Sequence, residues 1–105
     1  MESPPVTQTL VGSNKVDLDT PALCIDLDIM ESNIEKMASY MTTRGKQWRP
    51  HVKCHKTPAI SWKQIKAGAI GVTSAKVSEA EVFAFAGITD ILIANMIIGE
   101  KKHRR

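Results

Sequence analysis

Apolar residues in this chain follow two alternating patterns. Some stand in short continuous runs, and the run from Asp90 to Asn95, rich in Ile and Leu, is typical of a strand buried on both faces. Others recur with helical spacing, as Met30, Ile34 and Met37 do on one helix face. The predicted strands cover residues 22–26, 47–54, 69–74 and 90–95, and the predicted helices cover 28–45, 57–68 and 78–87.

Capping signals mark the ends of these helices. Asp28 followed by Glu31, and Ser78 followed by Glu81, have the spacing of capping boxes, so each pair predicts a helix start. Thr57 before Pro58 predicts a third start. Helices that alternate with short strands through short loops indicate βα repeats on a parallel sheet, an α/β fold. A doubly wound sheet and a (β/α)8 barrel both fit this pattern, but the three strands of the repeats, 47–54, 69–74 and 90–95, complete neither.

Charge is concentrated at one end of the chain. The formal charge of +3 comes with a basic tail, residues 101–105, and without its four lysines and arginines ten basic residues face eleven acidic ones. A near-neutral body argues against nucleic acid as the partner.

Residues 1–18 are predicted to be a flexible leader without a signal peptide, and no segment is long enough to predict a membrane span. Cys24 and Cys54 are interpreted as reduced thiols, so we expect a cytoplasmic protein.

The segment Arg49–Lys56, with the sequence Arg-Pro-His-Val-Lys-Cys-His-Lys, is the most informative stretch. Read as a strand, it places the side chains of Arg49, His51, Lys53 and His55 on one face. Such a cationic row is unfavourable unless an anion or a catalytic role requires it. Like charges two residues away, with partial burial, favour the unprotonated amine of Lys53. An unprotonated amine is the nucleophile that forms a Schiff base with a carbonyl.

This segment and three others resemble one enzyme family. The others are Asp19–Leu23, Ala75–Ala80 and Ile91–Asn95, and all four occur in the same order in the D-threonine aldolase and D-serine dehydratase family. That family has the barrel of the alanine racemase N-terminal domain, the fold type III pyridoxal-phosphate enzymes. The resemblance covers residues 19–99, roughly the first third of a family member. It implies that residues 19–100 are a partial barrel domain, roughly the first three βα units of a parallel (β/α)8 barrel.

The resemblance also implies a chemistry. Lys53 matches the family's Schiff-base lysine, which holds pyridoxal 5'-phosphate at the mouth of the barrel. The substrate would be a D-amino acid, cleaved by an aldolase or dehydrated by a dehydratase of the lyase class. Family members also use a divalent metal, whose ligands lie outside this chain, and the full-length enzyme is expected to be a homodimer. Ala75 departs from the family, because some aldolases carry glutamine there.

Other residues of the site are weaker candidates. His51 and His55 either line the cofactor site and tune the lysine, or are packed histidines bonded to backbone. Thr73 and Asn95, near strand ends, either contact cofactor or bond to backbone in turns. Arg49 is predicted to pair with a carboxylate. A zinc site is disfavoured because Cys54 lies on the opposite face from the histidines.

Two further functions remain open from the sequence. The chain could be a catalytically inactive truncated fragment, or an interaction module that keeps the βα repeats, since an open sheet exposes an unpaired edge. A basic nucleic-acid binder that uses residues 101–105 is the weakest hypothesis. We expect the 105 residues alone to be inactive, because they contain the candidate nucleophile but not the Gly-rich phosphate-binding segments that the family resemblance places outside this chain.

Overall fold

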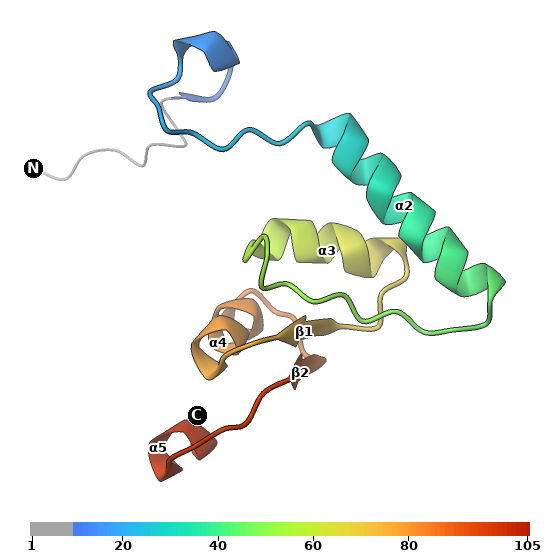
Figure 1. Cartoon of the computed structure of the whole chain (residues 1–105), viewed down its shortest axis with the longest axis vertical. Coiled ribbons are helices and arrows are strands. Elements are labelled where there is room, and N and C mark those ends of the chain that lie inside the picture. The colour runs from blue at the N-terminus through green and yellow to red at the C-terminus, as the bar shows by residue number, and fades with distance from the viewer. Residues whose placement is uncertain (1–9) are drawn as a thin grey trace, which may run out of the picture.

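The computed structural model describes residues 10–105, and the predicted leader therefore lies partly outside the described residues. Figure 1 shows the course of the chain. The elements in order are the 3-10 helix η1 (Lys15–Asp17), α2 (Leu27–Thr43), α3 (Pro58–Ala67), β1 (Val72–Ser74), α4 (Val77–Phe85), β2 (Ile91–Ile93) and α5 (Glu100–His103). The chain is thus of mixed α/β class, as predicted. No helix among residues 10–105 has both the length and the apolar character that a membrane crossing requires.

The sheet is small and parallel. β1 and β2 pair in parallel, with Thr73 opposite Leu92. Residues 48–52 run along the other side of β1, where His51 forms an isolated parallel bridge with Thr73. The Val52 N–H donates to the Thr73 carbonyl at 2.8 Å, and the Thr73 N–H donates to the Pro50 carbonyl at 2.8 Å. Three parallel segments therefore lie side by side, the middle one being β1.

Two predicted strands were wrong. The strand expected at 47–54 is reduced to a single bridge, because Pro50 has no N–H to donate and the Lys53 N–H bonds to the His51 ring instead. Residues 22–26 form no strand, since no described segment lies alongside to supply ladder hydrogen bonds. The strands expected at 69–74 and 90–95 are present but shorter, as β1 and β2.

The helix starts were predicted with mixed success. α3 begins after Thr57 and ends before Gly68, as the Thr-Pro and Gly signals indicated. The cap of α2 lies two residues earlier than predicted, because the Asp26 carboxylate, not that of Asp28, accepts the Ile29 N–H at 3.1 Å. α4 also begins earlier than expected, with Lys76 rather than Ser78 at its cap. There the Glu79 carboxylate accepts the Ala75 N–H at 3.2 Å, which satisfies a donor just before the first turn.

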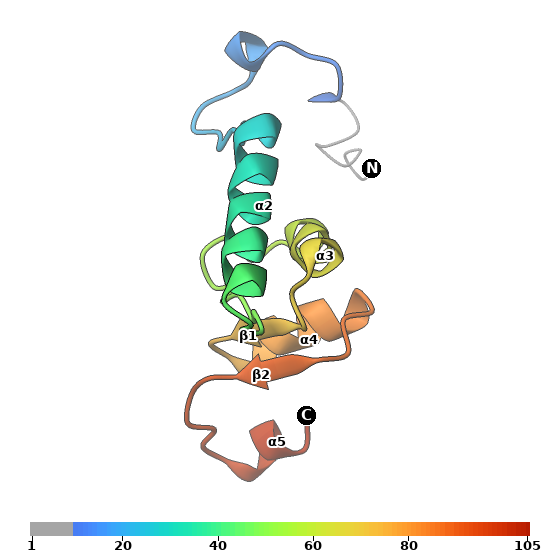
Figure 2. The same cartoon turned by 90° about the vertical axis from the view of Figure 1, so that its right-hand side faces the viewer.

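The core lies on one face of the three parallel segments. Val52, Val72, Phe83 and Ile88 are at most 3% exposed and form one cluster, against which Ile65 and Ile91 pack. Ile65 belongs to α3 and Phe83 to α4, so both crossover helices cover the same face of the sheet. Figure 2 shows β1 and β2 side by side, with α4 behind them and α3 above.

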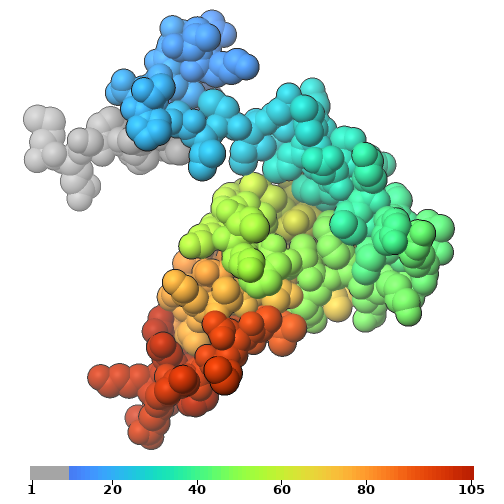
Figure 3. Space-filling view, in the orientation of Figure 1, coloured from blue at the N-terminus to red at the C-terminus, as the bar shows by residue number. Residues whose placement is uncertain are grey.

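The N-terminal part is attached loosely to this core. An ion pair at 2.7 Å between Glu31 and Lys63 joins α2 to α3, and Ala38 is the buried residue of α2. Upstream of α2 the chain extends away from the body, as Figure 3 shows. Leu23 is fully exposed there, and Ile25 and Leu27 are more than half exposed. This apolar surface has no partner among the described residues.

Candidate functional site

Two of the predicted site residues, Lys53 and Asn95, follow parallel segments at the carboxyl edge of the sheet. His51, Thr73 and Leu92 are aligned across the three parallel segments, so the residues that follow each segment emerge at one edge. Lys53 follows the first segment, and Asn95 follows β2. The Asn95 amide donates to the Ala75 carbonyl at 3.1 Å and so ties the loop after β2 to the loop after β1. Active sites of parallel β/α folds are built at this edge.

The expected partial burial of Lys53 on a strand face is wrong, because Lys53 is exposed and stands in a turn immediately beyond the last ladder hydrogen bond. Its backbone N–H donates to Nδ1 of His51 at 3.2 Å. Within residues 10–105 no carboxylate forms an ion pair with its amine. The amine is therefore accessible to a small carbonyl compound from solvent.

The two histidines of the motif have different surroundings. His51 is exposed, whereas His55 is half-buried between the turn and α3. Nδ1 of His55 accepts the Thr57 N–H at 2.9 Å, and its Nε2 lies 3.3 Å from Oε1 of Gln64. Its ring meets Phe83 edge-on, with centroids 6.5 Å apart. Burial lowers the pKa of His55, and the hydrogen bond to Gln64 opposes that shift.

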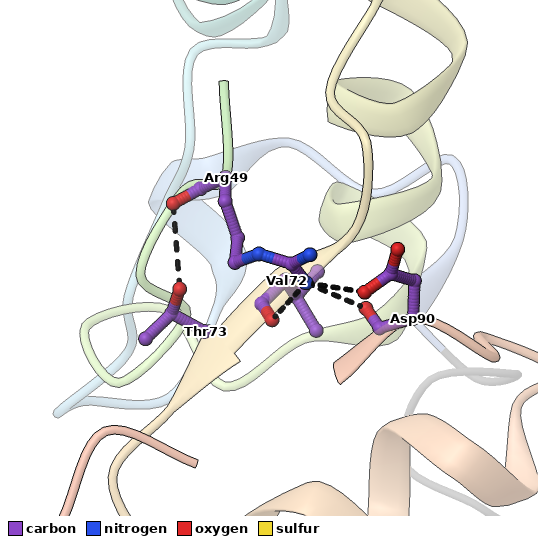
Figure 4. A network of polar contacts seen from close by, with 4 residues as sticks. All are labelled: Arg49, Val72, Thr73 and Asp90. Atoms are coloured by element: carbon purple, nitrogen blue, oxygen red, sulfur yellow. Dashed lines mark hydrogen bonds and ion pairs between the residues drawn. The ribbon is translucent and has the colours of Figure 1, made fainter. Parts of the chain in front are cut away.

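The opposite, amino-terminal edge holds a second polar cluster. Figure 4 shows the Arg49 guanidinium reaching past Val72 to Asp90. Nη1 of Arg49 lies 2.6 Å from the Asp90 carboxylate and donates to the carbonyls of Asp90 at 3.3 Å and Val72 at 3.4 Å. The predicted pairing of Arg49 with a carboxylate is confirmed. The buried Thr73 hydroxyl donates to the Arg49 carbonyl at 3.4 Å, so this predicted cofactor contact lies deeper than the carboxyl edge.

Sequence reasoning missed several residues that shape the site. Gln64, nine residues beyond His55, has no local signal that would mark it as a partner of the imidazole. Gly71 packs against Asp90 and Arg49, and a side chain there is excluded by the close approach of segments that are distant in the sequence.

The basic tail is partly ordered, because α5 includes residues 101–103 and the Arg105 guanidinium binds the Glu81 carboxylate through two nitrogens.

Two hollows border the carboxyl edge. One of about 140 Å³ lies beside Asn95 and is also lined by Ala75, Lys76 and Lys102. A larger groove of about 710 Å³ lies between α2 and the 48–55 segment, and both motif histidines line it.

No three His, Cys, Asp or Glu side chains gather into a possible metal site within residues 10–105. Cys24 and Cys54 are free and exposed.

The ion pair at the amino-terminal edge yields a stability prediction. Asp90→Asn should lower the free energy of unfolding by about 1 kcal/mol, because the Arg49 guanidinium, on a side chain only 23% exposed, loses its charged partner. Glu31→Gln, which removes the more exposed pair with Lys63, should cost about 0.3 kcal/mol. Urea unfolding of both variants measures the difference. Equal losses would contradict a special role for the Arg49 pair.

Comparisons with known proteins agree on one enzyme group. No family model matches the chain. The D-threonine aldolase of Arthrobacter sp. is 40% identical over 99 residues, which are 94% of this chain and 26% of that enzyme. The D-threo-3-hydroxyaspartate dehydratase of Delftia sp. is 49% identical over 77 residues, or 73% of this chain and 20% of that enzyme. The crystal structure of D-threonine aldolase from Filomicrobium marinum superposes with a TM-score of 0.82 at 49% identity, over 84% of this chain and 24% of that one.

The family resemblance inferred from the sequence is therefore confirmed. The relatives are lyases, aldolases and a dehydratase, and this chain is similar to a fragment of each. It spans about a quarter of the length of the relatives it matches, rather than the third expected from the sequence. The similarity includes nearly all of the chain, so it extends well beyond the lysine-containing motif.

Proposed function

We propose that this chain is the N-terminal portion of a pyridoxal-phosphate-dependent lyase acting on D-amino acids, with Lys53 as the residue that holds the cofactor. The observation that carries the proposal is that Lys53 stands exposed at the carboxyl edge of a parallel sheet, in a chain similar to D-amino acid lyases along almost all of its length. Catalytic residues of parallel barrels occupy this edge.

A barrel is the architecture that best accounts for the described fragment. Both crossover helices, α3 and α4, pack on the same face of the parallel segments. A doubly wound sheet places helices on both faces, whereas a barrel keeps them all on the outer one. We therefore propose that residues 48–93 begin a (β/α)8 barrel, whose remaining units and substrate contacts are supplied from outside this chain.

The residues present fit the aldehyde end of the cofactor. An accessible amine without a competing carboxylate is what capture of an aldehyde requires, and Lys53 has both properties within the described chain. When bound, the cofactor supplies an electron sink for bonds broken at the α-carbon of an amino acid. Nζ of Lys53 must be unprotonated to hold it. Asn95 keeps the neighbouring loops together by its bond to the Ala75 carbonyl, which would preserve the shape of the mouth.

The parent enzyme would cleave or dehydrate a 3-hydroxy D-amino acid, because both kinds of activity occur among the relatives. The residues that determine whether the substrate is cleaved or dehydrated would lie outside this chain, as would the ligands of a divalent metal. We propose a homodimeric, cytoplasmic parent enzyme without nucleic acid or membrane partners.

Borohydride trapping tests the role of Lys53. The full chain is incubated with pyridoxal phosphate, reduced with borohydride and digested, and the modified peptide is identified by mass spectrometry. We expect the adduct on Lys53, lost in Lys53→Arg and retained in the matched control Lys56→Arg. The same mapping in a chimera, in which the 99 matched residues of this chain replace the matching part of the Arthrobacter aldolase, supplies the complete barrel. An adduct concentrated on any other lysine in the chimera would refute the proposal.

A second candidate function rests on the exposed apolar surface. Phe85, Met96 and Ile98 are 90%, 84% and 75% exposed, and β2 has a free edge among the described residues. Such a surface favours a non-catalytic fragment or an interaction module that binds other chains. If the isolated chain stays monomeric and melts cooperatively without binding the cofactor, this hypothesis gains over the enzymatic one.

A further inference from the structure

Two histidines bracket the turn that carries Lys53. At its start, the Lys53 N–H donates to Nδ1 of His51 at 3.2 Å. At its end, the Thr57 N–H donates to Nδ1 of His55 at 2.9 Å. Each histidine therefore accepts the backbone N–H two residues further along, as Asn and Asp side chains do in Asx-turns. Between them, the Lys56 N–H donates to the Val52 carbonyl at 2.8 Å and closes the turn.

This geometry indicates which ring nitrogen accepts in each histidine. A backbone N–H can only donate, so Nδ1 of each histidine is the acceptor. An imidazole that accepts at Nδ1 carries its proton on Nε2. For His55 this agrees with the second contact, in which Nε2 lies 3.3 Å from Oε1 of Gln64, an acceptor. The lowered pKa of His55, which results from burial, also favours the neutral ring.

The turn is anchored more firmly at its end than at its start. His55 contacts Gln64 of α3 and meets Phe83 of the core edge-on. The Thr57 hydroxyl donates to the His55 carbonyl at 2.6 Å, which strengthens the same corner. His51 is exposed, so its contribution must come from the hydrogen bond rather than from burial. Lys53 thus lies between His55, whose ring contacts α3 and the core, and His51, whose ring is exposed.

We propose that His51 and His55 are positioning residues, which accept the Lys53 and Thr57 N–H groups at Nδ1 and thereby hold the turn that presents the Lys53 amine at the carboxyl edge. The inference deepens the proposed function and rests on it for the role of the lysine. It gives each histidine beside Lys53 a role in a backbone hydrogen bond rather than in a hydrogen bond to the amine.

Isosteric substitutions separate this role from simple packing. Asparagine places an acceptor oxygen close to the position of Nδ1, whereas glutamine extends its amide toward the position of Nε2. We compare His51→Asn with His51→Gln, and His55→Asn with His55→Gln, in the full chain without cofactor. The readout is hydrogen exchange of the Lys53 and Thr57 amides by NMR. Protection of the α3 amides serves as the control for folding.

The two variants at each position should differ. We expect the Lys53 amide to exchange about tenfold faster in His51→Gln, as loss of one net hydrogen bond implies, and to remain protected in His51→Asn. The Thr57 amide should respond in the same way to the His55 variants. Equal protection in the Asn and Gln variants, or equal loss in both, would overturn the proposal.

A measurement on the unmodified chain keeps the test independent of folding in the variants. Imidazole nitrogen chemical shifts at neutral pH should show an unprotonated Nδ1 and a protonated Nε2 in His51 and His55. A protonated Nδ1 in either ring would also overturn the proposal. Neither readout uses the cofactor, so the two proposals can fail separately. If the histidine spectra are as expected but borohydride trapping gives no adduct on Lys53, the proposed function is rejected and the positioning role of the histidines is not.

Discussion

Alanine at position 71 should destabilise the chain by about 3 kcal/mol, the upper part of the range for overpacking a tight site. A Cβ on Gly71 would lie 2.2 Å from the backbone oxygen of Asp90 and 2.8 Å from Nη1 of Arg49. The Asp90 oxygen cannot move freely, because it accepts the Val72 N–H at 3.0 Å at the start of the β1–β2 ladder. Relief of the clash must therefore separate the strands or displace the Arg49 guanidinium.

A glycine without neighbours is the matched control for this substitution. Gly45 has a φ of +64° and nothing within 4 Å of the position that an added methyl group would take, so Gly45→Ala meets backbone strain but no steric contact. That strain costs about 1 kcal/mol. Urea unfolding of both variants should show the larger loss for Gly71→Ala. A loss at position 71 no greater than at position 45 would mean that the strands adjust to the methyl group at little cost.

The fold could be predicted from the sequence where the signal was local. Thr57, Pro58 and Gly68 mark α3 by conformational preferences that act within a few residues, and the structure follows them. The start of α2 was predicted at the wrong residue, because Asp26 and Asp28 are both of a residue type that favours a helix cap. Asp28 was predicted as the cap, whereas in the structure the Asp26 carboxylate accepts the Ile29 N–H.

The candidate site was predictable in part for the same reason. Residue types in the motif made Lys53 a candidate, and parallel topology accounts for its place at the carboxyl edge. The surroundings of His55 could not be predicted, because side chains alternate between two faces only while the strand stays regular. The ladder ends at Val52, and beyond it the turn directs the His55 ring to Gln64 and Phe83.

Phe83→Ala should be the most damaging core substitution, with an expected loss of about 4 kcal/mol. Phe83 is 1% exposed and packs with Val52, Val72 and Ile88 in the one cluster that joins α4 to the parallel segments. Truncation leaves a cavity that a small core cannot close, and it removes the aromatic edge against which His55 rests. A loss of this size is a large fraction of the stability of a small domain.

Phe85 supplies an internal control for this prediction. It lies in the same helix but is 90% exposed, so Phe85→Ala should change stability by less than about 0.5 kcal/mol. Phe83→Leu keeps much of the volume but not the ring, and should cost less than alanine while still exposing the Thr57 amide to faster exchange. Urea unfolding measures the first effect and hydrogen exchange the second. If Phe83→Leu leaves the Thr57 amide fully protected, the aromatic contact does not support the turn that carries Lys53, and the hydrogen bonds of His55 alone hold it.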